Sequence, residues 1–208
     1  MTHIKITGLV RPEDADAAAR LGVDLVACVL SPASPRYVTT EQVWEIRRAL
    51  HGRAQLVGVF VDSPTPLVQR LMDHCQFDCA QLFGSEPRSA VEAVRPHAFK
   101  AVSVASAADA DLAGRVHGRR SGPAALPGLL LHVVEGASPG LVAGAARRHS
   151  LLLAAAGLTA DNVAEVIRDT RPWGVDVWDA VERSPGQLDL ARLEAFVTAV
   201  RAADAVPG

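Results

Sequence analysis

The sequence is poor in the features that mark secreted, membrane-spanning and disulfide-rich proteins. It has only 3 cysteines in 208 residues, which cannot all pair, and a chain of this length buries a core without a disulfide framework. No apolar run reaches the roughly 18 residues of a membrane span, and the N-terminus lacks a signal-like apolar run. We therefore expect reduced thiols, a cytoplasmic location and no membrane partner.

An excess of charge of one sign is missing as well. The 21 Lys and Arg residues are interspersed with 23 Asp and Glu residues, so the net charge is −2 with His neutral and no basic patch for nucleic acid is expected. Nucleotide-binding and metal-binding motifs are absent, and His74, Cys75 and Cys79 have no evident fourth ligand. We expect a small-molecule substrate, no nucleic acid, no cofactor, no metal, and a monomer or homodimer.

What the sequence does have is a regular alternation of helix-like and strand-like segments. Helix starts are indicated by Pro12, by Thr39 with Gln42 as a capping box, and by Ser63 with Pro64. Between the helix-like segments, short apolar runs are typical of buried parallel strands. These eight runs are Ile4–Ile6, Leu25–Leu30, Leu56–Val61, Cys79–Phe83, Phe99–Val104, Leu129–Val134, Leu151–Ala155 and Val175–Trp178.

Dividing 208 residues among eight units gives 26 residues per unit, enough for one strand, one helix and two short connections. This predicts an α/β fold, a single-domain (β/α)8 TIM barrel over residues 1–208, with 203–208 as a disordered tail. A doubly wound open sheet is the alternative, but no Gly-x-Gly-x-x-Gly follows the first strand. The fifth strand has the weakest pattern, and the Ala- and Gly-rich segment 136–148 is expected to form a poor helix.

The ends of the last two predicted strands are the most informative part of the chain. The stretch Gly174–Glu182 is typical of a buried strand that runs into a loop, and Ala154–Leu158 has the same form. Many α/β barrels bind a phosphate at the carboxyl ends of these two strands. Here Trp178 and Asp179 offer an indole and a carboxylate instead.

Short motifs occur in a fixed order along nearly the whole chain. They are Ile4–Leu9, Glu13–Ala15, Ser34–Val38, Gly58–Val61, Ala80–Gly84, Gly157 with Leu158, Asn162 with Val163, and Val175–Val177 with Glu182. Their order and spacing resemble the phosphoribosylanthranilate isomerase family. The resemblance implies a (β/α)8 barrel and an Amadori rearrangement of a phosphoribosylated anthranilate, with a strand-one cysteine as general base and a strand-six aspartate as general acid.

Both acid–base positions differ from the pattern that the resemblance implies. Thr7 stands at the cysteine position, and a threonine hydroxyl cannot take a proton at neutral pH as a thiolate can. His132 stands at the aspartate position, so an imidazole replaces a carboxylic acid. The histidine that the resemblance implies before Gly84 is Phe83 here.

The implied phosphate-binding loops differ too. The small residues expected after strands seven and eight are replaced by Ala155–Leu158 and by Trp178–Ala180. Repulsion between Asp179 and a phosphate about 4 Å away is on the order of several kcal/mol at an intermediate dielectric, more than one backbone N–H recovers. We therefore expect a phosphate dianion to be excluded.

His132 and Asp179 are the candidate catalytic residues. His132 lies at the end of an apolar run, and an imidazole with an unperturbed pKa of about 6.5 donates or accepts a proton; alternatively, it fills space and bonds a backbone carbonyl. Asp179 would orient His132 or act as a second acid–base group; alternatively, it is a solvated loop charge or a helix N-terminal acid. Asp176, Glu182 and Lys5 are interpreted as buried structural residues, with Asp176 bonding backbone amides.

Five residues are candidates for substrate binding. Thr7 offers a hydroxyl or simply fills strand one, Gln81 offers an amide, and the resemblance implies that Arg36 docks an acidic or otherwise polar group. Phe83 and Trp178 would form apolar walls for a planar ligand, or they belong to the core.

Together these residues favour a divergent phosphoribosylanthranilate isomerase-like barrel that acts as an isomerase, lyase or cyclase by general acid–base catalysis. Its substrate is expected to be a small, phosphate-free metabolite of a specialised biosynthetic pathway, with a planar part and room for a carboxylate. Two alternatives stay open. One is a non-catalytic binding or scaffold barrel, since fold does not fix function; the other is a working phosphoribosylanthranilate isomerase of tryptophan biosynthesis.

Overall fold

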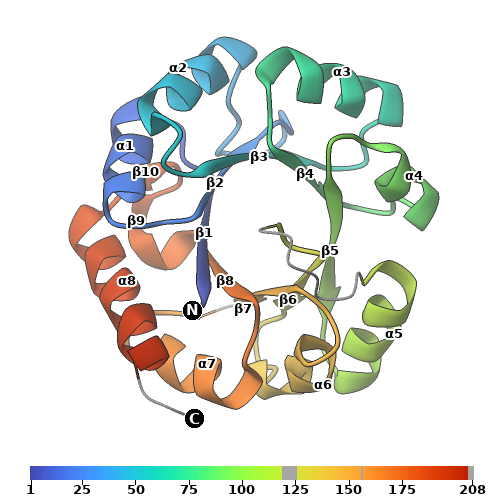
Figure 1. The fold of residues 1–208 in the computed structure, drawn as a ribbon, viewed down its shortest axis with the longest axis vertical. Coiled ribbons are helices and arrows are strands. Elements are labelled where there is room, and N and C mark those ends of the chain that lie inside the picture. Colours follow the sequence, from blue (N-terminus) through green and yellow to red (C-terminus); the bar gives the residue numbers. More distant parts are fainter. Residues whose placement is uncertain (119–125, 156, 206–208) are drawn as a thin grey trace.

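The strands form a closed parallel barrel with the helices around it (Figure 1). The computed structural model describes residues 1–118, 126–155 and 157–205. The strands follow one another in chain order, and the last pairs with the first. They are β1 His3–Thr7, β2 Leu25–Val29, β3 Gln55–Phe60, β4 Cys79–Phe83, β5 Ala98–Val104, β6 Leu129–Val133, β7 Leu151–Ala155 and β8 Gly174–Val177. The predicted (β/α)8 barrel is confirmed.

The helices cover the outside of the barrel and mostly begin where the sequence indicated. They are α1 Pro12–Arg20, α2 Thr40–Leu50, α3 Thr65–Cys75, α4 Arg88–Ala93, α5 Ala107–His117, α6 Ala143–Ala146, α7 Val163–Thr170 and α8 Leu190–Ala205. The capping box of Thr39 and Gln42 is confirmed, and Pro12 is the first residue of α1. Ser63 does not cap α3 as predicted, because its hydroxyl donates to the carbonyl of Val61 instead.

Three further segments refine the sequence analysis. The fifth strand, expected to be the weakest, is the longest of the eight at 7 residues. The segment 136–148 contains a 3₁₀ turn, η1 Pro139–Val142, and the four-residue α6. Helix α8 continues through Ala205, with Ala203 buried, so it takes up the first half of the segment expected to be a disordered tail. Residues 206–208 lie outside the described residues.

Alternation of side chains along the strands produces two cores. Side chains that point inward from β2 to β7 form one apolar cluster inside the barrel, and those that point outward pack under the helices. Both faces of each strand are therefore buried, which explains the continuous apolar runs of the sequence. Some of the inward apolar side chains, such as Val59 and Leu130, line a cavity together with polar inward residues.

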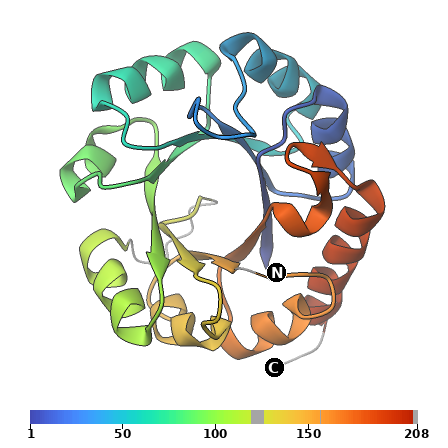
Figure 2. The ribbon, with the colours of Figure 1, turned by 180° about the vertical axis from the view of Figure 1, so that it is seen from behind.

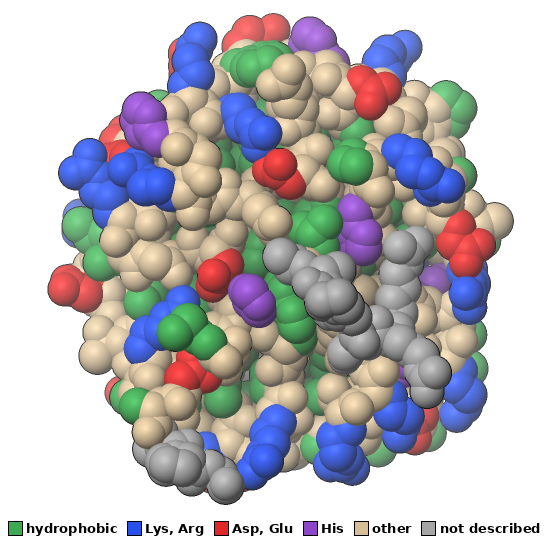
Figure 3. All heavy atoms as spheres, viewed as in Figure 1, with side chains coloured by type: hydrophobic (Ala, Val, Ile, Leu, Met, Phe, Trp, Pro, Cys, Tyr) green, Lys and Arg blue, Asp and Glu red, His purple; other side chains and the backbone are tan. Residues whose placement is uncertain are grey.

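Segments that follow the strands gather at one end of the barrel. In Figure 2 the loop after β2 and the hairpin of β9 Glu182–Ser184 and β10 Gln187–Leu188 lie on the near side of the ring. On the face shown in Figure 3, basic and acidic side chains are intermixed around the rim. Among the described residues, no helix combines the length and the apolar composition needed to cross a membrane.

Closure of the barrel between β8 and β1 leaves no room for a side chain at Gly174. A Cβ there would lie 2.7 Å from the carbonyl oxygen of His3 and 3.0 Å from Cδ2 of Leu152. We expect Gly174→Ala to lower the free energy of unfolding by about 1–3 kcal/mol, the usual cost of overpacking, measured by urea denaturation. Gly140→Ala is the control, because its Cβ would lie 3.5 Å from Oγ of Ser138, an ordinary contact. Equal losses in both variants would contradict this account of closure.

Candidate active site

A cavity of about 380 Å³ lies at the carboxyl ends of the strands. Six of the seven predicted site residues line it: Thr7, Arg36, Gln81, Phe83, His132 and Trp178. The seventh, Asp179, does not, whereas Asp176, interpreted from the sequence as purely structural, does. Residues distant in sequence are therefore brought together at the end of the barrel where active sites of this fold form.

His132 faces the cavity from β6. It is half-buried, and its ring lies 5.2 Å from that of Trp178 at an interplanar angle of 56°. Its ring makes no hydrogen bond within the described residues, so the backbone carbonyl contact considered as an alternative is not found. Burial lowers the pKa of His132, and the negative charges of Asp176 and Asp179 oppose that shift. An imidazole that is neutral at pH 7, and able to accept a proton, therefore faces the cavity.

Lys5, Thr7 and Asp176 form a buried polar cluster where β1 meets β8. The Lys5 ammonium lies 2.9 Å from Oδ2 of Asp176, and the two side chains are 0% and 1% exposed. The Thr7 hydroxyl donates to Oδ1 of Asp176 at 2.8 Å and accepts from Lys5. Burial raises the pKa of Asp176, while Lys5 and the hydrogen bond from Thr7 oppose that shift. The expectation that Asp176 bonds backbone amides is wrong, because its partners here are side chains.

This cluster decides what Thr7 offers to a ligand. Its single hydroxyl proton is directed at Asp176, and one lone pair accepts from Lys5. The oxygen keeps one acceptor position. Thr7 therefore presents an acceptor to the cavity and has no means of acting as a base.

Arg36 reaches the cavity from the loop after β2, already paired with Glu182. Its Nε lies 2.9 Å from Oε1 of Glu182, which also accepts from the backbone N–H of Gly186 at 2.9 Å. The carboxylate raises the pKa of Arg36, chiefly through its hydrogen bonds. Arg36 passes close over Gly8, whose φ of +90° and missing Cβ leave space for the side chain. The guanidinium is thus held in place, with its charge matched.

The remaining walls of the cavity are mainly apolar. Trp178 and Phe83 stand at the rim, and Phe83 is 39% exposed. Gln81 lies deeper on β4, and its buried Oε1 has no hydrogen-bond partner among the described residues. Buried polar atoms are rarely left without a partner, so Gln81 is a group that a ligand would satisfy.

Asp179 lies at the edge of this arrangement. It begins the 3₁₀ turn η2 Asp179–Val181, is exposed, and its Oδ1 accepts from the backbone N–H of Ala180 at 2.9 Å. No hydrogen bond or ion pair joins it to His132 within the described ranges. Its catalytic role stays a prediction, and its position is that of the helix N-terminal acid considered as the alternative.

None of the three cysteines takes the place of the missing strand-one thiol. Cys28, Cys75 and Cys79 are buried and unpaired. Burial raises the pKa of Cys28 and of Cys79 to about 12, so neither is a thiolate at neutral pH. Of the cavity residues described, His132 is the one suited to proton transfer near neutral pH.

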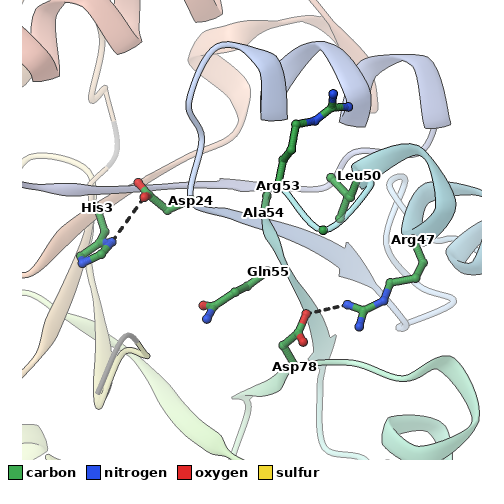
Figure 4. A pocket seen from close by; sticks show the side chains of 9 residues that line it. His3, Asp24, Arg47, Leu50, Arg53, Ala54, Gln55 and Asp78 are labelled. Carbon is green, nitrogen blue, oxygen red and sulfur yellow. Dashed lines mark hydrogen bonds and ion pairs between the residues drawn. The ribbon is translucent and has the colours of Figure 1, made fainter. Parts of the chain in front are cut away.

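A second cavity of about 360 Å³ lies at the opposite, amino end of the barrel (Figure 4). Two pairs of its polar side chains join one another, Arg47 with Asp78 at 2.6 Å and His3 with Asp24 at 3.5 Å, while Arg53 pairs with Asp16 outside it. These pairs join the starts of strands to neighbouring elements. Because this end of the fold serves stability rather than chemistry, the cavity lined by His132 and five other predicted residues is the candidate active site.

A closed (β/α)8 barrel with titratable side chains around a cavity at its carboxyl end defines a class, the barrel enzymes that act on small molecules. The family model of N-(5'-phosphoribosyl)anthranilate (PRA) isomerase matches residues 4–124 and 135–199. The chain belongs to this isomerase family.

Individual relatives are similar over nearly the full length. An N-(5'-phosphoribosyl)anthranilate isomerase of Afipia carboxidovorans is 35% identical over 98% of this chain and 91% of its own. The crystal structure of phosphoribosyl anthranilate isomerase from Thermotoga maritima superposes with a TM-score of 0.87 at 28% identity, covering 97% of this chain and 100% of that one. A second crystal structure of a phosphoribosyl anthranilate isomerase, in complex with reduced 1-(o-carboxyphenylamino)-1-deoxyribulose 5-phosphate, superposes with a TM-score of 0.83 at 29% identity. The match covers 97% of this chain and 100% of that one.

The pair of Arg36 and Glu182 generates a stability prediction. Glu182 has a 4% exposed side chain, so Arg36→Met would leave a buried carboxylate without its cation. We expect a loss of about 3 kcal/mol in the free energy of unfolding at pH 7, measured by urea denaturation.

The matched control is Arg53→Met. Arg53 pairs with Asp16 at the surface, with side chains 38% and 25% exposed, and we expect a loss below about 1 kcal/mol. An Arg36 variant as stable as the Arg53 variant would show that the buried pair does not hold the loop after β2.

Proposed function

We propose that the chain is a cofactor-free isomerase that transfers protons through His132 on a small, phosphate-free metabolite of a specialised biosynthetic pathway. The observation that carries the proposal is the half-buried His132 imidazole, with its lowered pKa, over a cavity with apolar walls. Lyase and cyclase reactions use the same proton transfers, and product analysis separates them. A cytoplasmic location and a monomer or homodimer stay predictions.

Charge balance in the cavity supports a substrate without phosphate. The two cations nearest the cavity are Lys5 and Arg36, and each is matched by a carboxylate, Asp176 and Glu182. Asp179 adds one negative charge at the rim. Within the described part of the chain, no unmatched Lys or Arg side chain lines this cavity. A dianion would therefore meet no net positive charge and one repelling carboxylate.

The residues at the two implied acid–base positions support a change in chemistry. Thr7 stands where the resemblance implies a cysteine, and its proton is committed to Asp176. His132 stands where an aspartate is implied, and the two ranges matched by the family model exclude 125–134, which contains β6 and His132. The strand that carries the proposed catalytic group thus lies outside the two matched ranges.

The proposed mechanism assigns one task to each group. Neutral His132 accepts a proton from the substrate, and the resulting imidazolium returns it at a second atom, which is general acid–base catalysis worth about 10²–10⁴-fold. Arg36, Gln81 and Thr7 position polar groups of the substrate. Trp178 and Phe83 form apolar walls that keep water from the reacting atoms.

The reaction named for the relatives is the second candidate, working phosphoribosylanthranilate isomerisation in tryptophan biosynthesis. What favours it is the 35% identity over nearly the full length of both chains. The relative in complex with the deoxyribulose 5-phosphate compound shows a cavity of this family accepting a ligand with a phosphate and a carboxylate.

Turnover of N-(5'-phosphoribosyl)anthranilate separates the two candidates. We expect no turnover above background by the wild-type protein and no rescue of a bacterium that lacks the tryptophan-pathway isomerase. Thr7→Cys with His132→Asp restores the implied acid–base pair, and with Trp178→Ser and Asp179→Ser it should raise turnover by about 10²-fold or more. Brisk turnover by the wild type, with rescue of that bacterium, would establish the second candidate instead.

A role for His132 in chemistry predicts a metabolic and a pH effect. We expect a host strain carrying His132→Asn to accumulate the same intermediate as a deletion strain, measured by untargeted metabolite analysis. A His132→Asn strain that resembles the wild type would favour a non-catalytic scaffold.

The pH effect follows from the lowered pKa of His132. The neutral imidazole is the base, so kcat/KM should be constant around pH 7 and fall on the acid side, below the ordinary histidine value of about 6.5. A profile that rises on acidification would contradict His132 as the base.

A further inference from the structure

We propose that Asp176, held by Lys5 and Thr7, is the carboxylate that stabilises the protonated form of His132 during the reaction. Asp179, the partner expected from the sequence, does not have this role. The inference rests on the proposed function, because it gives His132 a reaction to perform, but it makes a claim about the ligand-free protein that is measured separately.

The strand register places Asp176 and His132 at one level of the barrel. His132 pairs with Ala154 between β6 and β7, and Ala154 pairs with Asp176 between β7 and β8. Asp176 in turn pairs with Lys5 between β8 and β1. All four side chains point inward, so Asp176 lies between His132 and Lys5 in this row.

The residue between them leaves space. Ala154 is buried and carries only a methyl group, so no bulky side chain of β7 separates the imidazole from the carboxylate. Both His132 and Asp176 line the same cavity. His132 and Asp176 therefore face the cavity on either side of Ala154.

Asp176 has capacity left for this role. Its Oδ2 accepts from Lys5 at 2.9 Å and from Thr7 at 3.1 Å, whereas its Oδ1 accepts only from Thr7, at 2.8 Å. A carboxylate offers about four acceptor positions, so Oδ1 keeps one. The Lys5 and Thr7 contacts fix the carboxylate in place, and fixed charges stabilise a developing cation without reorganising during the reaction.

Other charged groups around His132 are less suited. Asp179, in the loop after β8, is exposed and is screened by solvent and salt. Arg36, in the loop after β2, is neutralised by Glu182 on β9. Lys5 lies behind Asp176 in the row. Consistent with this, the negative charge of Asp176 raises the pKa of His132 more than the negative charge of Asp179 does.

The test is a proton NMR titration of the His132 ring in the wild type, Asp176→Asn and Asp179→Asn, without substrate. We expect the pKa of His132 to fall by about one pH unit in Asp176→Asn. In Asp179→Asn, the matched control, it should fall by less, and the difference should shrink further at 1 M salt. A larger effect of Asp179→Asn, or an unchanged pKa in Asp176→Asn, would overturn the proposal.

A second variant keeps the test possible if Asp176→Asn alone does not fold. Asp176→Asn leaves Lys5 buried without its anion, which is costly, so Lys5→Met combined with Asp176→Asn removes both charges. We expect this double variant to fold and to show a His132 pKa below the wild-type value but above that of Asp176→Asn, because loss of the Lys5 cation offsets part of the loss of the carboxylate. A pKa at or above the wild-type value, which would mean that Asp176 acts on His132 no more strongly than the more distant Lys5, would overturn the proposal. Because no turnover is measured, failure here is distinct from failure of the proposed function.

Discussion

The ion pair between Lys5 and Asp176 joins the two strands at which the barrel closes. A (β/α)8 barrel needs its last strand to pair with its first, and here the closing pair carries opposite charges that are almost wholly buried. Removing one member of such a pair is strongly destabilising, because the other stays buried and unmatched. The same two residues hold Thr7, so closure of the barrel and the chemistry of the site share one set of contacts.

Charge neutrality of the cavity follows from this arrangement. Lys5 forms an ion pair with Asp176, and Arg36 forms one with Glu182. Neither cation is therefore unpaired and available to bind an anion. What distinguishes the cavity is instead the His132 imidazole, which lies beside the Trp178 indole and lines the same cavity as the fixed Asp176 carboxylate. The chain keeps the fold of its family, and the proposed function assigns to these groups proton transfer on a ligand without phosphate.

Much of the fold was predictable because it depends on local patterns. Apolar runs located all eight strands, and the capping box at Thr39 located the start of α2. The fifth strand was expected to have the weakest pattern, and it contains Lys100. In the structure Lys100 pairs with Glu86 at 2.9 Å, outside the barrel. This contact joins a strand to a loop, and no local sequence pattern predicts it.

The site was predictable in part for the same reason. Six of seven expected residues meet in one cavity, because carboxyl ends of parallel strands converge. The choice between Asp176 and Asp179 could not be made from the sequence, since it depends on which carboxylate the register aligns with His132. Two-residue alternation places Asp176 on the same strand face as Trp178, and this is the signal by which an inward Asp176 could have been found.

The central claim, that the mouth of this barrel no longer accepts a phosphate, is tested most directly by calorimetric titration of the wild-type protein with ribose 5-phosphate. The account predicts no binding up to millimolar concentrations. Binding with a micromolar Kd, with the phosphate seated between the loops that follow β7 and β8, would contradict it.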